Sequence, residues 1–336
     1  MTQLTKISDN SLMSESSAAK IVAVTVTYNI DQSFAVSLQS YLHQVALVVI
    51  VDNSTETEAQ SRVSAIAQGH PEQIALIQNG HNLGLAKAQN LGIRRALDEG
   101  AEWILLMDDD SSAESQMVEQ LVQANQIYPT EPGTGIVVPK YLEQSVNREA
   151  LFVTAPGGEY HRPRFAKVGF SGQPILQDIF IAISSGSLIK AELFNEIGMI
   201  RESFDIDYLD VDFCLRAIEA GYRIVAVRDA VLRHNLGEQT KHHFLGRHFF
   251  AWNHPARRRF TIYRNRTRIW REQLFRFPGF VLFDFLAALM DLFRIVMFEQ
   301  QKSAKLKSVL KGIGLGLFGS GLRKQTIDST ANTASG

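Results

Sequence analysis

Three adjacent carboxylates, Asp108, Asp109 and Asp110, are the side chains whose type and spacing most directly suggest chemistry in this chain. They follow the apolar run 103–107, which has the length of a buried β-strand. Adjacent carboxylates repel one another, so burying them at a strand end is costly unless they share a cation. Because hard divalent ions such as Mg²⁺ take oxygen ligands, the stretch suggests a metal site. A solvated acidic loop that caps the next helix explains it equally well.

Apolar runs and helical patterns alternate through the first half of the chain. Strands are predicted at 21–27, 46–51, 74–77 and 103–107, and helices at 33–42, 56–68, 118–128 and in a segment ending near Gly100. This alternation predicts an α/β protein with a parallel, doubly wound sheet and right-handed crossovers. The carboxyl ends of such strands converge on one crevice. Thr27, Asn29, Asp52 and the three aspartates all fall at predicted strand ends, so they are candidate ligand-binding residues.

Asn82 and Gly84 belong to an Asn- and Gly-containing segment between the third strand and the next helix. Glycine here would let the backbone approach a ligand closely. For these two residues, a turn that simply precedes a helix is about as good an explanation as a ligand-binding role. The segment contains neither G-x-G-x-x-G nor G-x-x-x-x-G-K-[ST], which argues against a dinucleotide oxidoreductase and a P-loop NTPase.

Bulk composition narrows the class of protein. The 336 residues are 45% hydrophobic, which supports a substantial core, and the formal net charge of -1 gives the whole chain no nucleic-acid signature. The single cysteine, Cys214, excludes an internal disulfide framework and fits a reducing compartment. Residues 1–20 are polar and Ser-rich, so we expect a disordered lead-in without a signal peptide.

Several motifs, taken in their order, resemble those of the family-2 glycosyltransferases with the GT-A fold. They are V-T-Y-N at 26–29, V-D-N-S at 51–54, N-L-G-L-A-K-A-Q-N-L-G-I at 82–93, L-L-M-D-D-D-S at 105–111, S-S-G-S-L-I at 184–189, F-D-I-D-Y-L-D-V-D-F-C-L-R-A at 204–217, R-H-N-L-G at 233–237 and I-Y-R-N-R at 262–266. The chain most resembles the bacterial rhamnosyltransferases, with galactofuranosyltransferases as close relatives. The resemblance implies a GT-A (nucleotide-diphospho-sugar transferase) α/β fold, in which a doubly wound mixed sheet forms a catalytic domain at 21–245 and a helical extension follows.

The resemblance also implies roles for individual residues. Asp110 and His234 would bind Mg²⁺ or Mn²⁺, because the matching histidine in related enzymes is a metal ligand and a neutral imidazole can complete such a site. Asp210 would be the catalytic base. The donor nucleotide sugar would be bound by Thr27, Asn29, Asp52, Asn82, Gly84, Lys87, Asp108 and Asp109. Lys87 offers a positive charge near Gln89, which stands where many members of the family carry Arg.

Ser185, Gly186 and Asp212 are assigned to the sugar and acceptor side of the site. A small-residue break inside a strand would let a ligand lie against the backbone at 184–187, whereas a β-bulge without a ligand is the plain alternative. For the carboxylates near a predicted helix at 209–220, the alternative is helix capping, with Arg216 as the i,i+4 partner of Asp212. Without the resemblance, that alternative would rank first.

The last third of the chain is basic and then apolar. Residues 233–276 contain eleven Lys or Arg against two Glu, close to +9, and the apolar segment 277–298 follows. Asp284, Asp291 and Arg294 interrupt this segment on roughly one side of a helix. This pattern favours an amphipathic helix in a membrane interface over a spanning helix, and a helical hairpin packed on the catalytic domain or a partner is the alternative. We expect a basic, amphipathic helical region at 246–325 and a flexible tail at 326–336.

Together these features predict a metal-dependent, inverting rhamnosyltransferase that uses dTDP-rhamnose. Its acceptor would be a saccharide, in one version linked to polyprenyl diphosphate, during assembly of a bacterial surface polysaccharide. The protein would be cytoplasmic and peripheral on the inner face of the plasma membrane, without a nucleic-acid partner and with homo-oligomerisation left open. The alternatives are a galactofuranosyl or other UDP-sugar transferase, a catalytically silent sugar-nucleotide-binding membrane subunit, and a metal phosphohydrolase.

Overall fold

A computed structural model of the chain describes residues 19–127, 133–143, 148–155, 158–159, 165–204, 206–234, 240–244 and 246–319. Of the predicted lead-in at 1–20, only Ala19 and Lys20 belong to the described residues, and the predicted tail at 326–336 lies outside them.

The first half of the chain forms the parallel, doubly wound sheet that its pattern predicts. Its elements are β1 (Ile21–Thr27), α1 (Ser33–Leu42), β2 (Leu47–Asp52), α2 (Thr57–Gly69), β3 (Ile74–Gln78), α3 (Leu85–Asp98) and β4 (Trp103–Asp108). The strands are parallel in the order β3-β2-β1-β4. Thr27 pairs with Asp52, and Val26 pairs with Asp108, so the polar strand ends meet at one edge of the sheet. The prediction that they converge is therefore confirmed.

The second half of the chain extends the same sheet and makes it mixed. Its elements are β5 (Ser112–Ala113), α4 (Met117–Ile127), β6 (Thr134–Glu143), β7 (Arg148–Glu149), β10 (Ile175–Leu176), β12 (Leu188–Lys190), α5 (Ala191–Glu196), α6 (Leu209–Glu219) and β13 (Arg223–His234). The sheet runs β10-β13-β6-β12-β4-β1-β2-β3, with β5 beside β13 and β7 beside β6. The short strand β12 is antiparallel to both β4 and β6, and it joins the two halves.

The predicted strand with a small-residue break near 184–187 is wrong. β11 (Ile179–Ile181) belongs to a separate sheet with β8 (Phe152–Thr154) and β9 (Ala166–Val168), whereas β12 lies in the main sheet. The small residues therefore form the connection between two sheets. Gly186 makes this turn possible, because its φ of 78° lies in the left-handed region that glycine adopts without strain.

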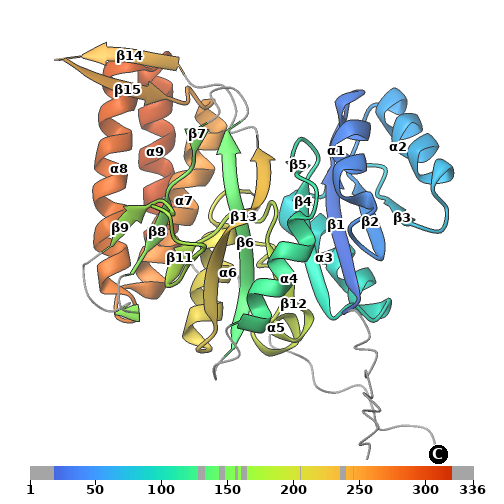
Figure 1. Cartoon of the computed structure of the whole chain (residues 1–336). Coiled ribbons are helices and arrows are strands. Elements are labelled where there is room, and N and C mark those ends of the chain that lie inside the picture. The colour runs from blue at the N-terminus through green and yellow to red at the C-terminus, as the bar shows by residue number, and fades with distance from the viewer. Residues whose placement is uncertain are drawn as a thin grey trace, which may run out of the picture.

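The core of the main sheet explains why its strands are almost wholly apolar. Val48, Val49, Ile50 and Val51 are consecutive residues of β2, and all are fully buried. Consecutive strand residues point to opposite faces, so both faces of this strand are covered. In Figure 1, helices lie over the sheet on both sides.

Three long helices stand beside the sheet at one end of the molecule (Figure 1). They are α7 (Ala256–Gln273), α8 (Pro278–Phe298) and α9 (Lys302–Phe318), and they follow the hairpin of β14 (Thr240–Phe244) and β15 (Arg247–Ala251). The predicted domain boundary at residue 245 lies outside the described residues. No helix within the described ranges combines the length and apolar content needed to cross a membrane.

Two glycines let α9 pack directly against α7. A Cβ atom at Gly312 would lie 2.6 Å from the carbonyl oxygen of Phe260, and one at Gly316 would clash with the Thr267 hydroxyl and the Arg264 carbonyl oxygen. The neighbouring Gly314 has no atom within 4 Å of the same position. The spacing of four residues puts Gly312 and Gly316 on one side of α9, where the two backbones come into contact.

Gly316→Ala and Gly314→Ala should therefore change stability in opposite directions. Alanine is the better helix former and should raise the free energy of unfolding by about 0.5–1 kcal/mol at Gly314. At Gly316 the clash should outweigh this gain and lower the free energy of unfolding by about 1–3 kcal/mol. Urea denaturation of the two variants and the parent checks this, and equal effects at both positions would contradict the close contact.

Candidate active site

Two acidic residues and a histidine meet at the carboxyl ends of β4 and β13. Asp108 is the last residue of β4, Asp110 lies in the turn that follows, and His234 ends β13. One oxygen of each carboxylate and one ring nitrogen of His234 lie within 4.8 Å of one another. The pairing of β5 with β13 sets Ser112 opposite Arg233, which brings His234 next to the aspartate turn. The donor set of two carboxylates and an imidazole suits a divalent cation.

A chain of hydrogen bonds holds the histidine beside the aspartates. The Asp108 N–H donates to Ser185 Oγ (3.2 Å), and the Ser185 hydroxyl donates to Ser111 Oγ (2.9 Å). Ser111 Oγ is hydrogen-bonded to His234 Nδ1 at 2.7 Å. Since Nδ1 is engaged, Nε2 is the ring nitrogen left to face an ion, and a hydrogen bond of this kind orients a ligating histidine.

Burial and mutual repulsion raise the pKa values of the aspartates. The pKa of Asp108 rises to about 8, mainly through burial and then through the charges of Asp110, Asp210 and Asp109. Burial followed by the charge of Asp110 raises the pKa of Asp109 to about 6. The pKa of His234 is lowered by burial, against the opposing effect of Asp110. The imidazole is therefore neutral at pH 7, as a metal ligand must be.

Asp210 lies in the first turn of α6 and close enough to Asp108 to affect its pKa. The hydroxyl of Ser184 donates a hydrogen bond to Asp210 Oδ1. Burial raises the pKa of Asp210 to about 6, although the hydrogen bonds from Ser184 lower it. A carboxylate with a pKa near neutrality is suited to general-base catalysis.

The loop before Asp210 is held by the C-terminal helices, in keeping with the alternative of a helical region packed on the catalytic domain. The Asn265 amide on α7 donates to the carbonyl oxygens of Ile206 (3.0 Å) and Asp207 (2.9 Å). Tyr208 has a left-handed φ of 66° just before α6. Its hydroxyl donates to Asp284 on α8 (2.9 Å) and accepts from Arg266. The motif I-Y-R-N-R contains Asn265 and Arg266 and was the available signal, but spacing alone gave it no role.

Thr27, Asn29 and Asp52, the predicted donor-binding residues around β1 and β2, form hydrogen bonds within the protein. The Asp52 carboxylate lies at the strand end and accepts hydrogen bonds from Thr27 Oγ1 (2.9 Å) and the Ser54 N–H (3.1 Å). Both side chains are buried, Thr27 wholly and Asp52 almost wholly. Asn29 Oδ1 accepts from the backbone N–H groups of Thr55 (2.9 Å) and Glu56. Thr27 and Asn29 therefore shape the loops around Asp52.

The glycine-containing segment forms the entrance to α3. Gly84 has a φ of 82°, and its N–H donates to Asn82 Oδ1 (2.8 Å). This geometry is the turn before a helix that the sequence allowed. Lys87 is exposed in the first turn of α3, whereas Gln89 is buried.

The structure brings Ser185 and Gly186 to the aspartates but not Asp212. The Gly186 N–H donates to the Leu106 carbonyl oxygen (2.7 Å), which fixes the turn against β4. Asp212 instead has a fully buried side chain that pairs with Arg216 (2.9 Å) and Arg201 (3.1 Å). The i,i+4 pairing therefore describes the contacts of Asp212, whose assignment to the acceptor side stays a prediction.

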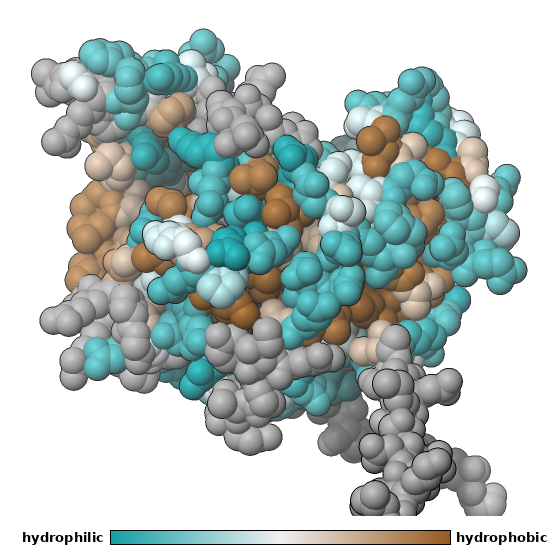
Figure 2. Space-filling model, in the orientation of Figure 1, coloured by the Kyte–Doolittle hydropathy of each residue, from teal (hydrophilic) through white to brown (hydrophobic). Residues whose placement is uncertain are grey.

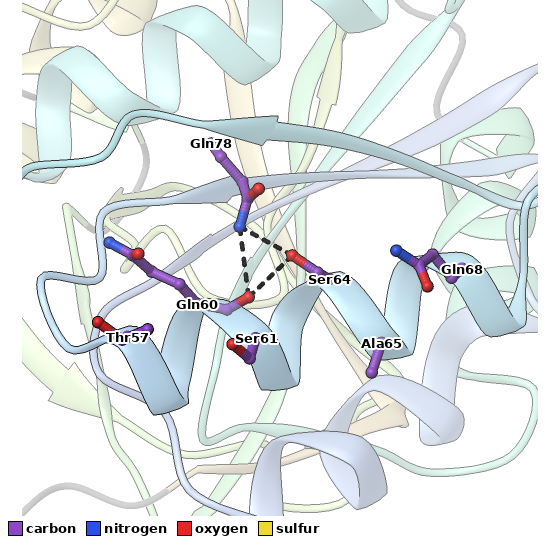
Figure 3. A pocket seen from close by; sticks show the side chains of 7 residues that line it. All are labelled: Thr57, Gln60, Ser61, Ser64, Ala65, Gln68 and Gln78. Atoms are coloured by element: carbon purple, nitrogen blue, oxygen red, sulfur yellow. Dashed lines mark hydrogen bonds between the residues drawn. The ribbon is translucent and has the colours of Figure 1, made fainter.

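A shallow pocket elsewhere on the molecule does not share the chemistry of this site. It lies between α2 and β3 and is lined by Thr57, Gln60, Ser61, Ser64, Ala65, Gln68 and Gln78. Figure 3 shows Gln78 directed at Ser64 and at the backbone of Gln60, with which it forms hydrogen bonds. Since no ionisable side chain lines this pocket, the aspartate cluster remains the candidate active site.

The sequence pattern of the family described as glycosyl transferase family 2 matches residues 22–198. The chain belongs to glycosyltransferase family 2. This match spans all strands of the parallel half and the aspartate turn. The protein is therefore a glycosyltransferase, and its mixed α/β sheet is that of the GT-A fold.

Curated relatives of this glycosyltransferase include enzymes for two different sugars. The dTDP-rhamnosyl transferase RfbF of Shigella flexneri is 29% identical over 236 residues, which cover 66% of this chain and 71% of the relative. The galactofuranosyltransferase GlfT1 of Mycobacterium tuberculosis is 26% identical over 251 residues, which cover 73% and 80% of the two chains.

Solved structures share the fold at low sequence identity. Residues 1–349 of S. aureus TarS align with a TM-score of 0.56 and 15% identity, over 89% of this chain and 81% of that one. The chain spans 44% of the longer TarS chain. GalNAc-T7 with UDP, GalNAc and Mn²⁺ aligns with a TM-score of 0.51 and 11% identity, over 88% of this chain and 58% of that one.

A divalent ion should stabilise this glycosyltransferase much more at pH 8 than at pH 5. The folded chain holds a proton on Asp108 up to about pH 8, whereas the ordinary pKa is 3.8, so without an ion stability falls as pH rises between these values. An ion must displace that proton, which becomes easier as pH rises. Mn²⁺ at about 100 times its Kd should add about 2.7 kcal/mol.

Thermal unfolding with and without Mn²⁺ at the two pH values measures this effect. Asp110→Ala should remove the Mn²⁺-dependent shift at pH 8. A shift of equal size at both pH values, or one that survives Asp110→Ala, would contradict binding at this cluster.

Ser111→Ala should weaken Mn²⁺ binding by about 10- to 100-fold, because the hydrogen bond that orients the imidazole of His234 is lost. Ser112→Ala is the matched control, since Ser112 is next in the chain and pairs with Arg233 through the backbone. Isothermal titration with Mn²⁺ compares the two variants. Unchanged affinity in Ser111→Ala would remove Ser111 from the support of the site.

Proposed function

We propose that this glycosyltransferase is a metal-dependent, inverting rhamnosyltransferase that uses dTDP-rhamnose. The observation that carries the proposal is the meeting of Asp108, Asp110 and His234 beside Asp210. This arrangement sets a candidate cation site close to a candidate base, as transfer from a nucleotide diphosphate sugar to a hydroxyl group requires.

The proposed reaction is a single displacement at C1 of the donor sugar. The oxygen of an acceptor hydroxyl forms a bond to C1, and its proton passes to the carboxylate of Asp210. The bond between C1 and the diphosphate oxygen breaks, and its electron pair leaves with the nucleotide diphosphate. Attack opposite the leaving group inverts the configuration at C1. The hydrogen bond from Ser184 orients the Asp210 carboxylate for this transfer.

The chain's own residues would hold the ion and the donor on the other side of C1. Asp110 and the Nε2 atom of His234 are the proposed ligands of Mg²⁺ or Mn²⁺, with Asp108 and Asp109 beside the donor. When bound, the ion neutralises the charge that develops on the leaving diphosphate. Asp52 at the end of β2 is the proposed acceptor of a hydrogen bond from the nucleoside. Asn82, Gly84 and Lys87 at the entrance to α3 would face the phosphates.

The similarity to the rhamnosyl transferase of Shigella flexneri supports rhamnose as the transferred sugar. The similarity to GlfT1 covers more of both chains and supports galactofuranose as the second candidate. Ser185 and Gly186, which form hydrogen bonds with the backbone of Asp108 and Leu106, are the proposed residues on the sugar side. We infer that the acceptor is a saccharide, which in one form of the proposal is attached to polyprenyl diphosphate. The reaction would take place on the cytoplasmic side of a bacterial plasma membrane.

A donor screen tests the proposal. Purified protein with Mn²⁺ and a bacterial membrane extract as acceptor is supplied with labelled dTDP-rhamnose, UDP-galactofuranose or other UDP-sugars. We expect label to enter the acceptor from dTDP-rhamnose and EDTA to abolish the transfer. Asp210→Asn should lower the rate by about 10²–10⁴-fold, since an amide cannot take the proton.

Asp229→Asn provides the matched control, because Asp229 lies on the exposed side of β13 and pairs with Arg228 (2.9 Å). It should leave the rate unchanged. Transfer from UDP-galactofuranose and not from dTDP-rhamnose would show that the proposed donor is wrong. Donor cleavage that is independent of acceptor would favour a phosphohydrolase, and transfer that resists EDTA would remove the role given to the aspartates.

A further inference from the structure

Helix α8 has its charged residues turned inward and its apolar residues turned outward. Asp284, Ala288, Asp291 and Ile295 follow one another at intervals of four, three and four residues, so they share one side of the helix. Ala288, Ile295 and Asp284 are buried, and only 14% of the Asp291 side chain is exposed. The expected orientation, with the charged side facing water, is therefore reversed.

The inner side of α8 is fully engaged with the rest of the molecule. Asp284 accepts hydrogen bonds from Tyr208 (2.9 Å) and from Trp270 Nε1 (2.7 Å). Asp291 pairs with Arg259 (2.9 Å), a buried residue of α7. These partners fix which side of α8 faces the core, so its apolar side is left in contact with solvent.

The outer side of α8 is a continuous apolar surface. Six of its side chains are between 44% and 56% exposed: Leu282, Phe285, Leu286, Leu289, Met290 and Val296. They recur at three- and four-residue intervals and therefore lie on one side. In Figure 2 brown residues gather along the margin of the molecule where Figure 1 shows α8 as the outermost helix. Contiguous apolar surface of this kind marks an interaction site.

On α8 and α9, both of which the structure describes completely, acidic residues face inward and most of the lysines are exposed. Their two acidic residues, Asp284 and Asp291, lie on the inner side of α8, and Glu299 between the helices is buried against Lys305 (2.9 Å). The charged residues of these helices that are exposed are lysines, at positions 302, 307 and 311. Exposed apolar side chains on α8 and exposed lysines on the neighbouring helix α9 together complement an anionic lipid surface.

We propose that the outer side of α8, with the exposed lysines of α9, docks on the surface of an anionic lipid bilayer. A bilayer supplies both an apolar interior for the leucines and negative headgroups for the lysines. A second copy of the chain would meet the first with the same lysines, and this like-charge contact is unfavourable. The proposal does not depend on which sugar is transferred.

Vesicle sedimentation of the full-length protein tests the proposal. One set of vesicles is pure phosphatidylcholine, and the other holds equal parts of phosphatidylcholine and phosphatidylglycerol. We expect stronger binding to the anionic vesicles. Leu286→Ser with Leu289→Ser should lower the partition coefficient by at least about tenfold, because each leucine loses its burial in the bilayer. Lys302→Ala with Lys307→Ala should lower it only for anionic vesicles, by about fivefold for each lysine.

Val36→Ser is the control for the leucine substitutions. Val36 is 71% exposed on α1, away from this surface, so its replacement should not change vesicle binding. Circular dichroism melts confirm that each variant is folded. No sedimentation of the folded parent with anionic vesicles would overturn the proposal. So would a dimer that dissociates on Leu286→Ser and Leu289→Ser while vesicle binding stays absent.

Discussion

Partial burial and mutual repulsion of the carboxylates at the end of β4 are the constraint on which the candidate site depends. The pKa of Asp108 is raised to about 8 because burial and the charges of Asp110, Asp210 and Asp109 all oppose its ionisation. A fold tolerates such a cluster if it serves a function that stabilises the ionised form. The fold provides His234 and the serine hydrogen bonds beside the cluster. These neutral groups orient the site without removing its negative charge, which leaves a set of donor atoms that suits a divalent cation.

The two halves of the sheet have different tasks in this arrangement. The parallel half brings Asp52 and Asp108 to one edge through the register of β1 with its neighbours. The mixed half supplies His234 through β13 and the Ser184–Gly186 turn before β12. Since β12 is antiparallel to β4, the residues just before it return to the carboxyl end of β4. The short antiparallel strand is therefore what brings the Ser184–Gly186 turn to the aspartates that follow β4.

Sequence reasoning succeeded where a local pattern determines the outcome. The alternation of apolar runs with helical patterns predicted the parallel sheet, and with it the shared edge of its polar strand ends. Sequence reasoning failed where the contact of a side chain depends on a residue far away in the sequence. Whether Asp212 faces a ligand or an ion pair depends on Arg201, which is remote in sequence and cannot be located by spacing. The break at 184–187 was read as part of one strand because composition does not distinguish a bulge from a passage between sheets.

The orientation of helix α8 shows most clearly what the sequence alone does not determine. This helix also connects the C-terminal helices to the loop before Asp210. Its heptad-spaced charges are equally compatible with a water-facing or a core-facing side, and only the buried partners Tyr208, Trp270 and Arg259 decide between them. Those partners make the inner side of α8 part of the support for the loop before Asp210. Any contact made by the outer side therefore bears on a helix that also holds Tyr208 in its left-handed conformation. Tyr208 thus connects α8 directly to the start of α6, where the candidate base Asp210 lies.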